Sequence, residues 1–181
     1  MKLGLALSAL LTVGVAIPAG SSPQIPSGRD VVSPAAYVSM EPAARGGEFQ
    51  IAVVLTIREG FHVNARQASA SYLIPTDIKA EVPAGFKLGE IQYPKGQLHT
   101  FSFSKQPLNV YEGKVVVRVA VSALGSAPLG TQHIPLKLHY QACNNEVCLP
   151  PATLNLDAAV TIAAAASDAR PAHSEHFRTD E

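Results

Sequence analysis

The chain has 181 residues, of which 14 are basic and 14 acidic, so its formal net charge is zero. The chain has no net positive charge and no run of basic residues, so nothing in its charge indicates a nucleic acid or an anionic membrane as partner. Fourteen prolines and thirteen glycines separate short apolar segments, a texture typical of an all-β domain.

The first twenty residues have the three parts of a secretory signal. Lys2 is followed by an apolar run from Leu3 to Ile17 and then by small residues around Ala19 and Gly20. The run is shorter than the roughly 20 residues that span a bilayer. We therefore predict cleavage near residues 19–20, no membrane span in the mature chain, and a periplasmic or otherwise exported location where disulfides form.

Composition divides the rest of the chain into three parts. Residues 21–30 are expected to be a linker, residues 31–162 one folded domain, and residues 163–181 a disordered polar tail. We expect the mature chain to be a monomer.

Alternating apolar residues indicate strands along the whole domain, the clearest being 48–58 with Phe49, Ile51 and Val53 on its inward face. The strands are predicted at 31–40, 48–58, 61–64, 78–82, 86–93, 115–122, 134–140 and 154–162. Short strands with turns at this spacing predict an all-β, immunoglobulin-like sandwich of two sheets.

Between Gln97 and Tyr111 the chain has little strand character, and Phe101 and Phe103 stand there among polar residues. Two interpretations are open. Both rings are ordinary core anchors beneath a long loop, or one of them covers a functional site as a lid, since long ordered loops are often functional.

Both cysteines lie in the segment YQACNNEVCLPP, residues 140–151. Carrying the alternation of residues 134–140 forward puts Cys143 on the outward face, so we predict that it lies at or near the surface. Residues 144–147 are predicted to form a four-residue hairpin loop, because Asn tolerates the left-handed conformation that turns need. Cys148 then lies opposite Cys143, at a spacing that a disulfide can bridge.

Three interpretations of this pair remain open. Exported domains often carry an inert disulfide, but one that closes so short a loop stabilises by only about 2 kcal/mol, against nearly 5 for a loop of about 100 residues. A redox-active pair is the second interpretation. The third is zinc, with His133 or His139 as further ligands; His139 lies about 13 Å along the strand from Cys143, so we predict no metal and no cofactor.

The cysteine segment is accompanied by GFHVNA at 60–65, YLIPT at 72–76 and VYEG at 110–113. Together these segments resemble the N-terminal periplasmic domain of the thiol:disulfide interchange protein DsbD, over residues 31–162. The resemblance implies an immunoglobulin-like sandwich whose reversible disulfide passes electrons between proteins. It also implies a cap loop that shields the disulfide with a Phe ring until a partner docks.

Residue by residue, the resemblance assigns the redox pair to Cys143 and Cys148, with Cys148 forming the mixed disulfide with partners. Residues 98–104 occupy the place of the cap, with Phe101 or Phe103 as the shielding ring. The implied partners are thioredoxin-like proteins and a membrane thiol reductase, both supplied by other chains.

Three further residues are expected near the pair: His62 and Asn64, which replace aromatic residues of the family, and Tyr140. We interpret His62 as a surface histidine of a loop or strand, with assistance to a cysteine as the alternative.

Two functions follow from these expectations. One is a thiol-disulfide electron carrier of the protein-disulfide oxidoreductase type, rather than a small-molecule enzyme. The other is a non-catalytic adaptor with a structural disulfide, acting for a membrane complex or in cytochrome maturation. The sequence contains no G-x-S-x-G or H-E-x-x-H motif of a hydrolase.

Overall fold

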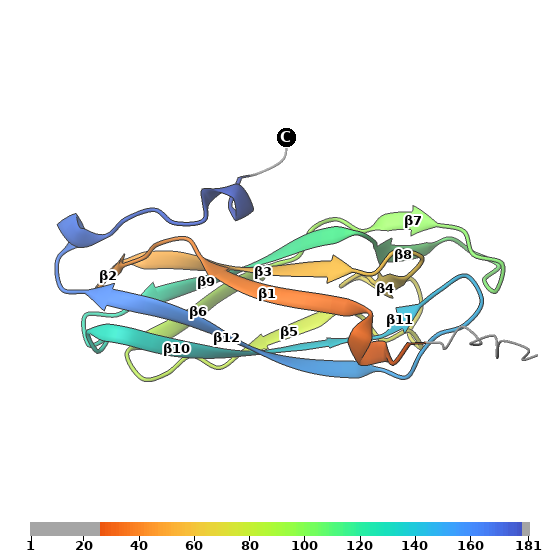
Figure 1. Cartoon of the computed structure of the whole chain (residues 1–181), viewed down its shortest axis with the longest axis horizontal. Coiled ribbons are helices and arrows are strands. Elements are labelled where there is room, and N and C mark those ends of the chain that lie inside the picture. Colours follow the sequence, from red (N-terminus) through yellow and green to blue (C-terminus); the bar gives the residue numbers. More distant parts are fainter. Residues whose placement is uncertain (1–25, 179–181) are drawn as a thin grey trace, which may run out of the picture.

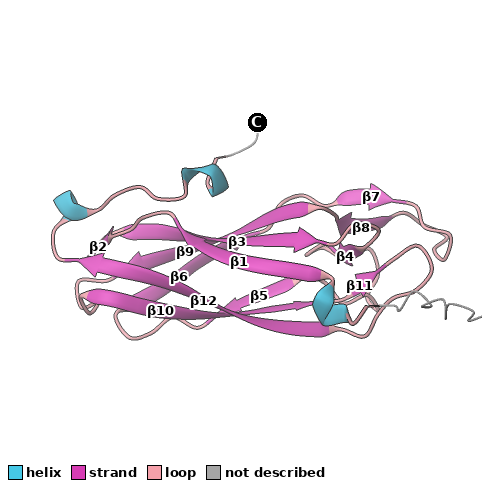
Figure 2. Cartoon of the chain, viewed as in Figure 1, coloured by secondary structure: helices cyan, strands magenta, loops and turns pink. Residues whose placement is uncertain are grey.

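The computed structural model describes residues 26–178. They form two long four-stranded sheets and a third, small sheet at one end of the molecule (Figure 1). The prediction of an all-β, immunoglobulin-like sandwich is confirmed, and the helices of the described part are three single 3-10 turns (Figure 2). The predicted signal peptide lies outside the described residues.

The first long sheet is antiparallel and has the strand order β1-β3-β9-β6, with β1 at one edge. Its strands are β1 (Val32–Val38), β3 (Glu48–Ile57), β9 (Lys114–Ala123) and β6 (Phe86–Gln92). The second has the order β2-β12-β10-β5, in which only the short β2 pairs in parallel. Its strands are β2 (Ala43–Ala44), β12 (Ala152–Ala163), β10 (Gly130–Tyr140) and β5 (Asp77–Ala80).

The alternation seen in the sequence builds the core between these two sheets. Ile51 and Val53 of β3 and Ile134 and Leu138 of β10 are fully buried in one continuous apolar cluster. Burying such side chains is the main favourable term of the fold, at roughly 25 cal/mol per Å² of apolar surface. The two long sheets therefore form the stable frame.

The third sheet was not predicted, because it joins short segments that lie far apart along the chain. Its order is β11-β4-β8-β7, all antiparallel. Its strands are β11 (Ala142–Cys143), β4 (His62–Asn64), β8 (Leu108–Tyr111) and β7 (Gln97–His99). It occupies the end of the molecule where β10 runs out (Figure 1). Both ends of the segment expected to have little strand character are thus strands.

The segment after β12 follows a defined course up to residue 178, where the sequence led us to expect disorder. Residues 170–172 pair with residues 39–42 through backbone hydrogen bonds of 2.8 to 3.0 Å. The rings of His173 and His176 lie 5.2 and 4.2 Å from that of Tyr37, and Arg118 donates to the carbonyl of Arg178. Low hydropathy cannot reveal such backbone pairing. The segment contains the 3-10 turns η2 (Ala166–Asp168) and η3 (Ser174–His176).

The end of the expected linker also belongs to the domain. Residues Gly28–Asp30 form the 3-10 turn η1, capped by the Ser27 hydroxyl, and Gly28 is buried. A side chain on Gly28 would meet the Pro150 carbonyl at 2.7 Å, so the turn packs closely against the segment that follows the cysteines.

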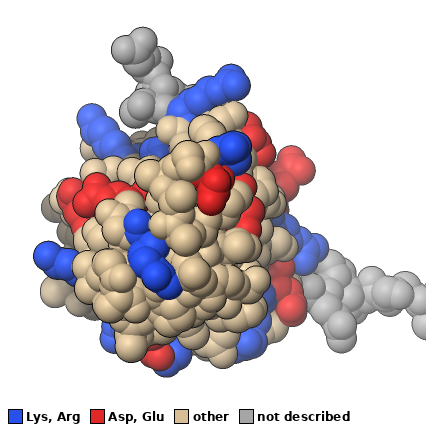
Figure 3. All heavy atoms as spheres, turned by 90° about the vertical axis from the view of Figure 1, so that its left-hand side faces the viewer, with Lys and Arg blue, Asp and Glu red and all other residues tan. Residues whose placement is uncertain are grey.

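Within residues 26–178, no helix has the length and apolar character needed to cross a bilayer. Figure 3 shows the end opposite the third sheet, where acidic and basic side chains are interspersed on a largely uncharged surface. That face therefore carries no extended patch of a single charge.

Candidate functional site: a buried disulfide at the third sheet

The two cysteines form a disulfide at the base of a short hairpin, with Cα atoms 3.9 Å apart. The predicted loop is present: the amide of Asn144 bonds to the Val147 carbonyl at 3.0 Å, and Cys143 and Cys148 form an antiparallel bridge. The Asn144 side chain accepts from the amides of Glu146 and Val147 at 2.9 and 2.7 Å. Asn144 thus closes the turn by accepting hydrogen bonds, and the only positive φ outside glycine among the described residues is at His173.

Cys143 is buried, with 1% of its surface exposed, so the prediction that it lies at or near the surface is wrong. The alternation holds as far as Tyr140, but the chain then leaves β12 and pairs with β4. Side chains that point outward from the second long sheet at β10 therefore point to a covered face of the third sheet at β11. Cys148 is partly exposed, so the two sulfurs are not equally accessible.

His62 lies directly opposite Cys143 in the register of β4 and β11. It is buried, with 2% of its surface exposed, which corrects the interpretation of a surface histidine. Desolvation, with a smaller effect of His99, lowers the pKa of its imidazole to about 4, so the ring is neutral at neutral pH. Within the described residues its Nε2 atom is buried without a hydrogen-bond partner.

Two phenylalanine rings stack with the ring of His62. Phe101 lies on the His62 ring with centroids 4.0 Å apart and planes 20° apart. Phe103 stacks on Phe101 at 5.4 Å. Phe101 is 7% exposed and Phe103 43%, so the stack runs from solvent down to the residue that pairs with Cys143.

Phe101 belongs to a small apolar cluster with Leu73, Leu108 and Val110, separate from the main core. It is therefore a core anchor, as one interpretation had it, but of the third sheet. The loop that carries it also reaches the cysteine hairpin, because the Ser102 hydroxyl donates to the Asn145 carbonyl at 3.0 Å. The two interpretations of these rings are compatible.

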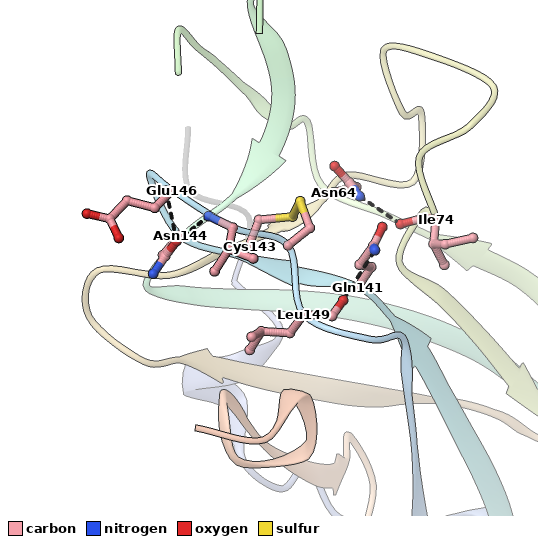
Figure 4. Close-up of a disulfide and its surroundings, with 9 residues drawn as sticks. Asn64, Ile74, Gln141, Cys143, Asn144, Glu146 and Leu149 are labelled. Carbon is pink, nitrogen blue, oxygen red and sulfur yellow. Dashed lines mark hydrogen bonds between the residues drawn. A yellow bond between two sulfur atoms is a disulfide. The ribbon is translucent and has the colours of Figure 1, made fainter. Parts of the chain in front are cut away.

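Asn64 is buried next to this site and fastens a neighbouring loop. Its side-chain amide donates to the Ile74 carbonyl at 3.0 Å, and its backbone carbonyl accepts from the Thr76 hydroxyl at 2.7 Å. Figure 4 shows the disulfide between this contact and the Asn144 turn, with the Gln141 amide directed at the Leu149 carbonyl. The YLIPT segment is a loop over the site rather than a strand.

Tyr140 has a structural role. Its ring is fully buried, and its hydroxyl donates to the Gly28 carbonyl at 2.7 Å, holding the 3-10 turn η1 on the domain. His139 and His133 are engaged on the outer face of β10, by Thr153 at 2.9 Å and Asp157 at 2.5 Å. The described residues contain no group of three His, Cys, Asp or Glu side chains able to hold a metal ion.

Sequence reasoning placed Asn144 in the hairpin loop but not the hydrogen bonds of its side chain, and it missed Ser102. Asn144 carried a usable signal, because an Asn two or three residues before the amides it accepts from is a common turn device. Ser102 carried none, since its partner is a backbone carbonyl far along the chain.

The fold and the site together define an all-β domain with a short-loop disulfide, one of whose cysteines is buried opposite a histidine. The sequence matches, over residues 29–159, the family described as "Thiol:disulfide interchange protein DsbD, N-terminal". The chain belongs to this family, so it is a thiol-disulfide interchange domain.

Solved structures with similarity to the chain include two bacterial domains and one from yeast. The reduced DsbD N-terminal domain of Neisseria meningitidis is 20% identical, with a TM-score of 0.42 over 76% of this chain and 90% of that one. The N-terminal periplasmic domain of ScsB from Proteus mirabilis is 16% identical, with a TM-score of 0.45 over 66% and 44%. The GAE domain of GGA2p from Saccharomyces cerevisiae is 11% identical, with a TM-score of 0.38 over 70% and 97%. A search of curated proteins gave no match.

Proposed function

We propose that this protein is a periplasmic electron carrier, which passes reducing equivalents between thioredoxin-like proteins through a reversible Cys143–Cys148 disulfide. The observation that carries the proposal is the place of the disulfide. It closes a loop of a few residues on the third sheet, where a covalent link contributes little stability. The loop of Phe101 and Ser102 contacts both His62, the residue opposite Cys143, and the cysteine hairpin. A purely structural disulfide does not require such a covering loop.

Unequal access supports a role for each cysteine. Cys148 is partly exposed and Cys143 is not, so the thiolate of an incoming partner attacks the sulfur of Cys148, and Cys143 leaves. A mixed disulfide forms, and the second thiol of the partner resolves it. In the reverse direction the reduced Cys148 attacks the disulfide of an acceptor, and Cys143 resolves.

The stacked rings act as the cap in this proposal. While the Ser102 hydroxyl is bonded to Asn145, the cap excludes small thiols and oxidants from Cys143. Docking of a partner opens it. Four large apolar residues around this end of the molecule are exposed and supply the docking rim: Tyr72 (77%), Leu98 (70%), Phe103 and Val147.

A membrane thiol reductase on another chain supplies the electrons, and the predicted signal peptide delivers the protein to the periplasm. The printed name of the ScsB structure, a periplasmic domain, supports this location, and the thiol:disulfide interchange family supports the choice of thioredoxin-like partners. The alternative, an exported adaptor with an inert disulfide, differs in whether the pair cycles.

The reduction potential of the pair tests the proposal. The purified protein is equilibrated in dithiothreitol redox buffers, and alkylated thiols are counted by mass. A potential between roughly −120 and −270 mV, the range of known exchange proteins, is the expected result. A potential below about −300 mV, or reduction only on unfolding, would identify a structural disulfide and favour the adaptor.

A further inference from the structure

The position opposite Cys143 holds a polar atom with nothing to bond to. Directly opposed residues of an antiparallel pair share a face of the sheet, with Cβ atoms about 5 Å apart. His62 and Cys143 are such a pair, and both are almost fully buried. The Nε2 atom of His62 is nevertheless without a partner in the described residues, whereas most buried polar atoms have one.

The oxidised state of the pair explains why this nitrogen is unpaired. A disulfide sulfur has no proton to donate and no charge, so it offers the imidazole little. Reduction changes this, because Cys143 then becomes a thiol or a thiolate, and a thiolate accepts a charge-assisted hydrogen bond. A partner for the orphan nitrogen therefore appears only when the disulfide opens.

We propose that His62 is the hydrogen-bond partner of the Cys143 sulfur in the reduced protein, donating its ring N–H to the thiolate that forms when the disulfide is cleaved. The proposal rests on the proposed function, because it assigns a residue to the same exchange reaction.

The exchange step balances as follows. A partner thiolate attacks the Cys148 sulfur; the bond between the partner and Cys148 forms, the Cys143–Cys148 bond breaks, and its electron pair stays on Cys143. His62 donates its hydrogen bond to this sulfur. The second thiolate of the partner then attacks its own sulfur in the mixed disulfide and releases Cys148. The partner is oxidised to a disulfide. Of the two protons that its thiols release, one goes to Cys148 and the other to solvent, and Cys143 remains the thiolate that accepts the hydrogen bond of His62.

The surroundings make His62 a neutral donor rather than a base. Phe101 covers its ring face, and the burial that lowers its pKa also opposes formation of an imidazolium. The other titratable groups on this side are His99 of β7, whose Nδ1 lies 3.2 Å from Glu112, and the exposed Glu146 of the hairpin. None of them is paired with Cys143 in the sheet, so His62 is the residue placed to act on its sulfur.

A bond made only in the reduced state favours that state. We expect its loss to lower the equilibrium constant for reduction about tenfold, which is about 30 mV for this two-electron couple. We also expect the pKa of the Cys143 thiol to rise by about one unit.

Two substitutions distinguish the effect of the N–H donor of His62 from the effect of its ring. His62→Phe keeps a flat ring beneath Phe101 and removes the donor. His62→Gln removes the ring and retains an N–H donor. His139→Phe, on the outer face of β10, is the control for a histidine away from the pair. Each variant is measured as the full protein in dithiothreitol redox buffers, and the pKa of the Cys143 thiol is taken from alkylation rates in the Cys148→Ala background.

The expected result is a potential lowered by about 30 mV in His62→Phe, largely restored in His62→Gln, and unchanged in His139→Phe. If wild type and His62→Phe share one potential and one thiol pKa, the proposal is wrong while the exchange function stands. Equal shifts in His62→Phe and His62→Gln would assign the effect to packing and also overturn it. A wild-type disulfide that reduces only on unfolding would instead contradict the exchange function itself.

Discussion

The sandwich and the third sheet differ in strand length and in the polarity of their buried side chains. In the sandwich, strands of up to twelve residues bury apolar side chains such as Ile51 and Val117 completely. In the third sheet, strands have two to four residues. All three buried polar residues of the described chain lie on it or just beside it: His62, Asn64 and Thr76. Stability is concentrated in the first region, and groups able to change state are concentrated in the second.

Val63, Tyr111 and Ala142 of the third sheet still pack in the main core, whereas Phe101 and Leu108 belong to the small separate cluster. Opening of the proposed cap would therefore disturb the small cluster and leave the main core in place. Each experiment below tests whether the two regions are separable in this way, beginning with the largest expected effect.

Truncating one core side chain in each region tests the separation directly. Ile51→Ala should cost about 2 to 5 kcal/mol of unfolding free energy without changing the rate at which dithiothreitol reduces the native disulfide. Leu108→Ala, in the small cluster, should cost less because the third sheet can relax, and should accelerate reduction. Urea unfolding and timed alkylation give the two quantities. Equal costs with unchanged reduction rates would mean that the two regions are one unit.

Acid should weaken the third sheet through His62. The pKa of this group is near 6.5 in the unfolded chain and about 4 in the folded one. As pH falls from 6.5 towards 4, the unfolded state takes up a proton that the folded state does not, so stability falls, by about 3 kcal/mol at most. The stability is fully present above pH 6.5. Urea midpoints across this range measure the effect.

His62→Phe is the matched control, because carboxylates titrate in the same window in both proteins. The free energy of unfolding of wild type minus that of this variant should be lower at pH 4 than at pH 7, by about 3 kcal/mol at most. A difference independent of pH would show that His62 is not held neutral by burial.

Removing the disulfide should cost about 2 kcal/mol, since the loop it closes is short. Cys143→Ala and Cys148→Ala should both unfold cooperatively in urea, with the same dependence on denaturant concentration as wild type. A loss of unfolding free energy well above about 4 kcal/mol would mean that the disulfide is structural and that the third sheet unfolds together with the two long sheets.

The cap contact should contribute about 1 kcal/mol to closure, as one hydrogen bond does. Ser102→Ala removes the bond to Asn145 and should raise the rate of reduction by dithiothreitol several-fold. Ser104→Ala is the control, because its hydroxyl bonds only within the same loop, to Gln106. Equal rates in the two variants would show that the loop does not gate the disulfide.

The smallest effect on stability, within about 0.5 kcal/mol, is expected at the exposed rim. Leu98→Ser should slow electron exchange with a thioredoxin while leaving reduction by dithiothreitol unchanged. Leu129→Ser is an equally apolar, exposed change in the loop between β9 and β10, at the far end. If both variants exchange electrons with the thioredoxin at one rate, the rim takes no part in docking.

The sequence by itself determined the frame and the pairing of the two cysteines in a disulfide. The alternation along residues 48–58 and 134–140 is a local property, because successive side chains of a strand point to opposite faces. It therefore predicted which residues face the core, and the spacing of the two cysteines with two Asn between them predicted the hairpin and its disulfide.

Only the tertiary structure decided that Cys143 and His62 are buried and opposed. Their pairing joins β11 to a strand from much earlier in the chain, and their cover comes from Phe101 in a third segment. Period-two alternation assigns a residue to one of two faces, but it does not say what lies over that face. The same limit applies to the segment after β12, because its residues 170–172 are held by backbone bonds to residues 39–42 and not by apolar content.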